Sequence, residues 1–181
     1  MEIAVLGGGN GSYAAAAHLS EQGHSVRMWR RNHSRFSKIL SSREIALEDW
    51  ESERKVKIDM ATDDLSSAIK GAKLVLIPLP ATCHNQLSNE VAPYLEDGQV
   101  VFFSPGTFGS YIFAESLRCS DNPAQVTFAE TGTLPYLARK QSEEKVRISV
   151  YATRLPTGVY PSNRTAMAME ILSNAYPAVE P

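Results

Sequence analysis

The sequence contains only two cysteines, Cys83 and Cys119, which are far apart and do not have the spacing of a metal site. We therefore expect free thiols in a reducing cytoplasm and no disulfide. No apolar run is long enough to cross a bilayer, and the first strand begins at residue 2, so we expect no signal peptide. The net charge of −2 at pH 7 provides no general basic surface. These features predict a cytoplasmic protein that binds neither nucleic acid nor membrane.

The sequence also lacks the residue sets of several common catalytic sites. It has no Ser/His/Asp arrangement, no cluster of metal ligands and no Walker A lysine. Among its four histidines, His84 is the candidate proton donor, because the other three lie on the first predicted helix, before the second strand or in the helix that follows it. An isolated histidine in the first turn of a helix is more often solvated, and we expect this of His84. We therefore assign neither a catalytic residue nor a metal site to this chain.

The most informative segment is residues 3–12, Ile-Ala-Val-Leu-Gly-Gly-Gly-Asn-Gly-Ser, followed by alanines. It predicts a buried strand, a tight turn and the start of a helix, which together hold a nucleotide pyrophosphate. A glycine at the turn permits the sharp bend, and the next glycine of the motif lets the backbone approach the phosphates. Serine replaces the third glycine. The predicted cofactor contacts are Gly7, Gly9, Asn10, Gly11 and Ser12.

Strand and helix patterns alternate along the rest of the chain. We predict strands at 2–6, 25–29, 73–80, 99–104, 125–130 and 147–153, and helices at 11–22, 33–42, 62–70 (capped by Thr62 or Asp63), 82–95, 108–118 and 162–176. The charged stretch 43–59 fits a hairpin or a loop. Right-handed crossovers then give an α/β fold with a doubly wound, mostly parallel Rossmann sheet and helices on both faces. Residues 1–176 form one NAD(P)-binding domain, and 177–181 resemble a connector.

Two arginines, Arg30 and Arg31, follow the second strand, where a carboxylate would bind the ribose 2′-hydroxyl of NAD. No acidic residue occurs between Gly23 and Glu44. A guanidinium can bind the 2′-phosphate of NADP, which a carboxylate would repel. The pattern therefore favours NADP as cofactor and leaves NAD open. The alternative is that both arginines are solvated surface charges.

Other predicted strand ends add further candidates. The strand at 73–80 ends in prolines that form a flat apolar surface suited to contact the face of a base or nicotinamide. The strand at 99–104 ends in a turn whose glycine lets a ligand approach the backbone closely. Glu130 follows the fifth strand, where a carboxylate can bind an amine-bearing substrate or, alternatively, cap a helix or a turn. The additional predicted cofactor contacts are Pro78, Leu79, Pro80, Pro105 and Gly106.

Three segments together resemble the NAD(P)-binding domain of the octopine/nopaline (opine) dehydrogenase family. They are residues 7–12, Ser104-Pro-Gly-Thr107, and Glu130-Thr-Gly-Thr-Leu-Pro-Tyr136 followed by Arg139. The last is the most specific, although the family has asparagine where Gly132 stands. The resemblance implies reductive condensation of an amino acid with a 2-oxo acid, with Glu130 and Thr133 near the substrate. It also implies an all-helical C-terminal domain carrying a catalytic histidine and its acidic partner, beginning about where 177–181 ends.

Other readings of the sequence remain open. Arg27-Met-Trp-Arg-Arg-Asn32 and Leu74-Val-Leu-Ile-Pro-Leu-Pro80 are also similar to glycerol-3-phosphate dehydrogenase, and ketopantoate reductase shares the same plan. A free-standing domain of this kind can also act as a non-catalytic nucleotide-binding module. A homodimer is compatible with the sequence, because exposed apolar surface around the crevice would favour self-association.

Overall fold

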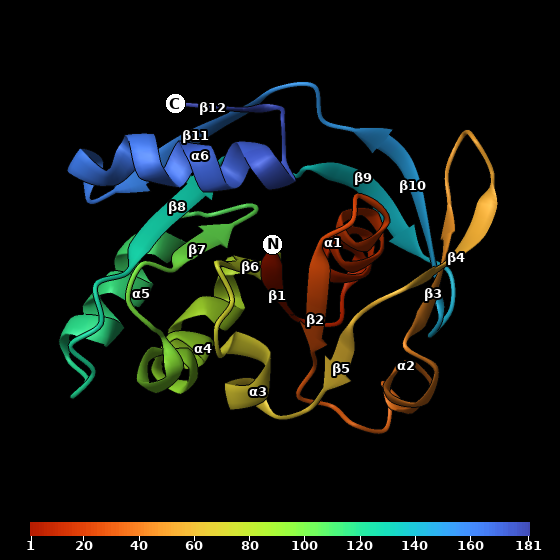
Figure 1. Cartoon of the computed structure of the whole chain (residues 1–181), viewed down its shortest axis with the longest axis horizontal. Coiled ribbons are helices and arrows are strands. Elements are labelled where there is room, and N and C mark those ends of the chain that lie inside the picture. Colours follow the sequence, from red (N-terminus) through yellow and green to blue (C-terminus); the bar gives the residue numbers. More distant parts are fainter.

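The computed structural model describes residues 1–181 and shows an eight-stranded main sheet (Figure 1). Its strand order is β12-β11-β8-β7-β6-β1-β2-β5. Neighbouring strands are parallel except β11, which is antiparallel to β8. The strands are β1 (Glu2–Leu6), β2 (Ser25–Trp29), β5 (Met60–Thr62), β6 (Leu74–Ile77), β7 (Val100–Phe103), β8 (Thr127–Thr131), β11 (Leu155–Tyr160) and β12 (Val179–Glu180).

Helices cover both faces of this sheet (Figure 1). One face carries α3 (Leu65–Ile69), α4 (His84–Val91) and α5 (Gly109–Arg118), while the other carries α1 (Asn10–Glu21) and α6 (Thr165–Ala175). A separate buried apolar cluster lies on each face. Because both sides of β6 are covered, all four of its residues are buried, which explains its continuous apolar sequence. The predicted doubly wound, mostly parallel α/β fold is confirmed.

A second sheet has the order β4-β3-β10-β9 and packs against α1. Its strands are β3 (Glu44–Glu48), β4 (Glu53–Lys57), β9 (Tyr136–Lys140) and β10 (Lys145–Tyr151). Of the two alternatives for 43–59, a hairpin or a loop, the structure has the hairpin, formed by β3 and β4. The strand predicted at 147–153 was wrongly placed in the main sheet, because β10 pairs in parallel with β3 instead. Alternation of buried and exposed residues in β3 and β10 matches a sheet covered on one face only.

Several predicted boundaries also differ from the structure. The helix expected at 33–42 is shortened to α2 (Ser37–Ser42). The N-cap of α3 is Asp64, whose carboxylate accepts hydrogen bonds from the backbone of Ser66 and Ser67. Short 3-10 turns at Ala81–Cys83, Ala92–Tyr94 and Ser162–Arg164 flank α4 and precede α6. Within the segment expected to be a connector, two residues pair with β11 as β12.

Candidate dinucleotide-binding site

The glycine turn joins β1 to α1 at the carboxyl edge of the main sheet. Gly7 has a φ of +134°, and a Cβ there would lie only 2.6 Å from Ser12 Oγ, so no other residue fits this turn without strain. Gly9 is the N-cap of α1 and provides no side-chain cap. A Cβ on Gly9 would have no neighbouring atom within 4 Å. The space beside Gly9, at the start of α1, is therefore open, which fits a pyrophosphate.

The remaining residues of the turn are engaged with the protein itself. Ser12 is fully buried, and its hydroxyl lies against the turn at Gly7 without a hydrogen-bond partner. A Cβ on Gly11 would lie 3.1 Å from Cβ of Pro78, so Gly11 allows this close approach. Asn10 Oδ1 accepts a hydrogen bond of 2.9 Å from the backbone N–H of Lys140. These contacts fix the shape of the turn, and direct cofactor contacts from these side chains stay a prediction.

The two arginines after β2 have different environments. Arg30 lies over Gly8, and its Nη1 donates a hydrogen bond of 2.5 Å to the carbonyl of Arg35. Arg31 forms an ion pair of 2.7 Å with Glu90 on α4. The charge of Arg31 is therefore partly compensated, whereas Arg30 has no carboxylate within ion-pair distance.

A cavity of about 270 Å³ opens beside the glycine turn. It is lined by Gly7, Gly8, Trp29, Arg30, Arg31, Asn32, Leu79, Thr82, Cys83, Gln86 and Leu87. The cavity therefore brings together four of the predicted site residues from three strand ends. The lining residues Thr82 and Cys83, from the 3-10 turn before α4, and Gln86 and Leu87, from α4, were not predicted, although the Pro-Leu-Pro segment before them indicates the same edge. Position and lining suit the adenosine part of a dinucleotide.

A second cavity, of about 440 Å³, lies at the carboxyl end of β8. It is lined by Thr107, Glu130, Thr131, Gly132, Pro156, Thr157, Gly158 and Pro181. Of the two predicted substrate residues, Glu130 lines it, while Thr133 is exposed outside it. Pro105 is half-buried and Pro80 is exposed, and neither lines the two cavities.

The Glu130 carboxylate caps the N-terminus of α5. It accepts hydrogen bonds from the backbone N–H groups of Phe108 and Ser110, at 3.2 and 3.0 Å, and from the Ser110 hydroxyl at 2.8 Å. Thr107 and Phe108 both have left-handed backbone conformations, which cost energy for residues other than glycine. A Cβ on Gly106 would lie 2.3 Å from Glu130 Cβ, so this glycine makes room for the carboxylate. The helix-capping alternative for Glu130 is thus realised.

The expectation that His84 is solvated was wrong. The side chain is fully buried, with its ring centroid 5.3 Å from that of Phe103. Its Nε2 donates a hydrogen bond of 3.2 Å to the Leu79 carbonyl, and Nδ1 has no partner. Burial lowers the His84 pKa, while the Leu79 carbonyl and the charge of Glu130 raise it. A fully buried imidazole cannot reach a substrate to protonate it.

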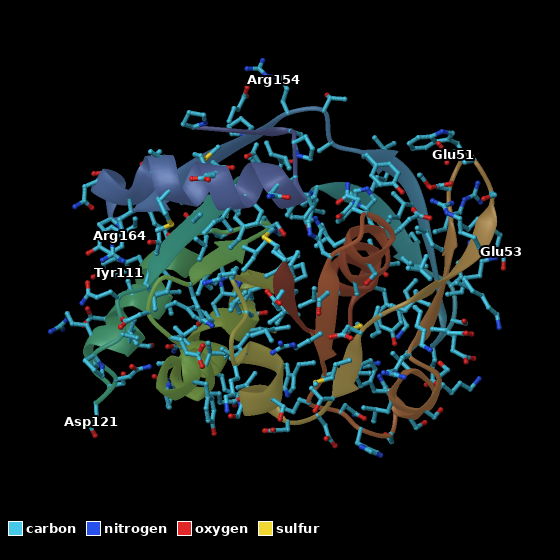
Figure 2. The ribbon with its side chains drawn as sticks, viewed as in Figure 1. Glu51, Glu53, Tyr111, Asp121, Arg154 and Arg164 are labelled. Atoms are coloured by element: carbon cyan, nitrogen blue, oxygen red, sulfur yellow. The ribbon has the colours of Figure 1, made fainter.

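The largest cavity, of about 580 Å³, lies at the amino end of β8, away from the glycine turn. Tyr111 and Arg164, labelled in Figure 2, line it from α5 and from the turn before α6. Ligands of doubly wound sheets bind at the carboxyl ends of the strands, so size alone does not make this cavity the cofactor site.

Residues 2–107 match the family described as the NAD-dependent glycerol-3-phosphate dehydrogenase N-terminus. The chain belongs to this family. The match contains the glycine turn, the two arginines and the Pro-Leu-Pro wall, so this part of the chain is an NAD(P)-binding domain. None of the helices is both long and apolar enough to span a membrane.

Relatives that match nearly the whole chain are opine dehydrogenases, which confirms the resemblance noted in the sequence. The chain is 30% identical to an opine dehydrogenase from Arthrobacter sp. over 96% of its own length, and 26% identical to octopine dehydrogenase from Pecten maximus over 98%. An octopine dehydrogenase structure with NADH and L-arginine superposes with a TM-score of 0.84 at 24% identity, covering 99% of this chain and 48% of that one. The chain spans about half the length of these relatives, 48% in both sequence matches.

Proposed function

We propose that this chain is the NADP(H)-binding half of an opine-dehydrogenase-like oxidoreductase that reductively condenses an amino acid with a 2-oxo acid. The segment Glu130–Tyr136 carries the proposal, because it lies outside the part shared with the glycerol-3-phosphate dehydrogenase family. The near-complete coverage of this chain by opine and octopine dehydrogenases supports it. So does the solved octopine dehydrogenase that contains NADH and pyruvate.

The proposed cofactor is NADP(H). The start of α1 holds the pyrophosphate, and the cavity between Gly8, Arg30 and Leu79 holds the adenosine. A cation at the ribose supports binding of a 2′-phosphate, and no carboxylate after β2 opposes it. When bound, the nicotinamide supplies the hydride for reduction of an imine.

The proposed amino-acid site is the cavity at the end of β8, with Glu130 at its wall and Thr133 close by in sequence. Imine reduction also needs a proton donor near the nitrogen. The strand ends provide glycines, prolines, arginines and a carboxylate that caps α5, while His84 is buried. We therefore propose that a helical domain following residue 181 supplies the proton donor. The greater length of the relatives supports this.

Nucleotide titrations test the cofactor proposal. NADPH should bind more tightly than NADH, and Arg30→Asp should reverse the preference because it removes the cation and adds an acceptor for the 2′-hydroxyl. Alkylation provides a positional test, because both cysteines are exposed but only Cys83 lines the adenosine cavity and Cys119 does not. NADPH should slow the reaction of Cys83 with iodoacetamide and leave that of Cys119 unchanged. Equal affinity of the wild type for both nucleotides would contradict the choice of NADP.

Assays with L-arginine and pyruvate test whether residues 1–181 bind the cofactor while a following helical domain supplies the proton donor. Residues 1–181 should bind NADPH without oxidising it, and activity should require the sequence extended into a helical domain. Turnover by residues 1–181 that is lost in His84→Ala would place the proton donor in this domain instead.

The family match over residues 2–107 favours one second candidate, oxidation of glycerol 3-phosphate. The extended protein should reduce NADP⁺ with glycerol 3-phosphate if this candidate is correct. Activity with amino acid and 2-oxo acid, and none with glycerol 3-phosphate, would decide for the opine type.

A further inference from the structure

Lys140, the last residue of β9, is held along the first turns of α1. Its backbone N–H binds Asn10 Oδ1, and its Nζ lies 3.9 Å from the centroid of the Tyr13 ring. Asn10 and Tyr13 are three residues apart and share one face of the helix. The Tyr13 hydroxyl donates a hydrogen bond of 2.9 Å to the carbonyl of Glu143, which fixes the β9–β10 turn on the same face. The second sheet thus delivers a lysine to the glycine turn.

The charges of two arginines, Arg30 and Arg35, act on this lysine. Arg30 reaches across Gly8 and binds the carbonyl of Arg35. Burial lowers the pKa of Lys140, and the charges of Arg30 and Arg35 lower it further, with Glu143 acting in the opposite direction. Arg30 also lowers the pKa of the Tyr13 phenol against the larger, raising effect of burial. Arg30 covers Gly8 and Lys140 is bound at Asn10 and Tyr13, so both cations border the first turn of α1. Together with Arg35, whose charge acts on Lys140, we call them the cation cluster.

No member of the cation cluster forms an ion pair with a carboxylate. Other cations of the same region do so: Arg31 pairs with Glu90, and Lys145 of the second sheet pairs with Glu48. Like charges held together without counterions repel one another, and a bound dianion relieves that repulsion. A phosphate monoester carries nearly two negative charges and accepts charge-assisted hydrogen bonds from several cations at once.

We propose that Lys140 is the second cation of the 2′-phosphate site, acting with Arg30, and that Arg31 is not. This rests on the proposed function, in which the cofactor is NADP(H). The pyrophosphate binds at Gly9 and the start of α1, whereas Arg30 marks the ribose after β2. Lys140 is bound at Asn10, two residues from the Gly8 that Arg30 covers, so its charge acts at the ribose end. The second sheet, which has no place in the simple doubly wound plan, thereby contributes to cofactor choice.

The test compares ligands that differ only in the 2′-phosphate. Affinities of the chain for 2′,5′-ADP, 5′-ADP, NADPH and NADH are measured by calorimetry for wild type, Lys140→Met and Lys140→Arg. Lys140→Met should weaken 2′,5′-ADP and NADPH by about tenfold, the usual loss for one charge-assisted hydrogen bond, and change 5′-ADP and NADH less than about twofold. Lys140→Arg should retain most of the preference. Lys57→Met, at the opposite edge of the same sheet, is the matched control and should change nothing.

The outcomes separate this inference from the proposed function. A wild type without preference for 2′-phosphorylated ligands contradicts the choice of NADP itself. A wild-type preference that is unchanged in Lys140→Met overturns the role of Lys140 alone. An equal loss for all four ligands, with an unchanged melting temperature, places Lys140 at the pyrophosphate and also overturns it. If Arg31→Met loses the preference as strongly as Lys140→Met does, the assignment of Arg31 is wrong.

Discussion

The side chain of Arg30 occupies the space that a side chain on Gly8 would fill. A Cβ on Gly8 would lie 2.4 Å from both Cδ and Nε of Arg30. Gly8 is the variable position between the two glycines of the motif, yet here its missing side chain lets the guanidinium lie across the turn. The position of the cation that we assign to the 2′-phosphate therefore depends on a glycine outside the motif.

Gly8→Ala should displace Arg30 while the fold persists, because the end of an arginine side chain can move aside. Affinity for NADPH should fall by roughly tenfold, as for loss of one charge-assisted hydrogen bond, and affinity for NADH should fall less. Fluorescence titration of both nucleotides measures the ratio. The comparison variant is Gly7→Ala, whose φ of +134° and contact with Ser12 should destabilise the fold by roughly 1–3 kcal/mol. Equal weakening of both nucleotides in Gly8→Ala would contradict the displacement.

The glycine turn and the arginines after β2 could be predicted because their signals are local. A strand, a turn and a helix start follow one another within ten residues, and Arg30 directly follows the next strand. The second sheet could not be predicted in the same way, since β10 pairs with β3 about a hundred residues earlier. Lys140 lies on β9 of that sheet and reaches the site because β9 packs against α1, so no local pattern marks it as a site residue.

Side-chain environments were also beyond the reach of the sequence. Arg30 and Arg31 are adjacent and alike, but only the folded position of Glu90 on α4 pairs one and leaves the other unpaired. His84 is buried in the core against Phe103 and Phe113, and no sequence pattern around it indicates this. Both results depend on where neighbouring elements pack, and sequence patterns give the type of an element more reliably than such contacts.

Gly9→Val should abolish most nucleotide binding and leave the fold intact. A valine there meets no protein atom within 4 Å of its Cβ, and the backbone of Gly9 is extended, which a β-branched residue tolerates. The branched side chain would instead occupy the space in which the pyrophosphate approaches the start of α1. Nucleotide titration combined with circular dichroism separates the two effects. Normal binding by a folded Gly9→Val variant would place the phosphate site elsewhere.

Glu130→Ala should destabilise the fold by about 1–2 kcal/mol, the usual cost of losing a helix cap. The change removes three hydrogen bonds at the N-terminus of α5 and leaves the left-handed Thr107 and Phe108 without their support. Chemical denaturation measures the loss. Thr133→Ala, at an exposed neighbour, should remain within about 0.5 kcal/mol of the wild type. Equal stability of the two variants would show that the cap contributes little.

Three histidines should make the protein less stable at mildly acidic pH. Burial is the main cause that lowers the pKa values of His18, His24 and His84 below the ordinary value of 6.5. Between that value and the lower folded-state pKa, the unfolded chain binds more protons than the folded one. The free energy of unfolding is therefore highest above pH 6.5 and decreases as the pH falls through this window.

His84→Gln should flatten this dependence, because glutamine can still donate a hydrogen bond to the Leu79 carbonyl but does not titrate. The variant is expected to be less stable than the wild type at pH 7.5, since the amide fills the aromatic surroundings of Phe103 less well. Its free energy of unfolding should nevertheless change less between pH 7.5 and pH 5. Urea denaturation at several pH values gives both slopes. Parallel slopes for the two proteins would show that His84 is not among the groups that take up protons on unfolding.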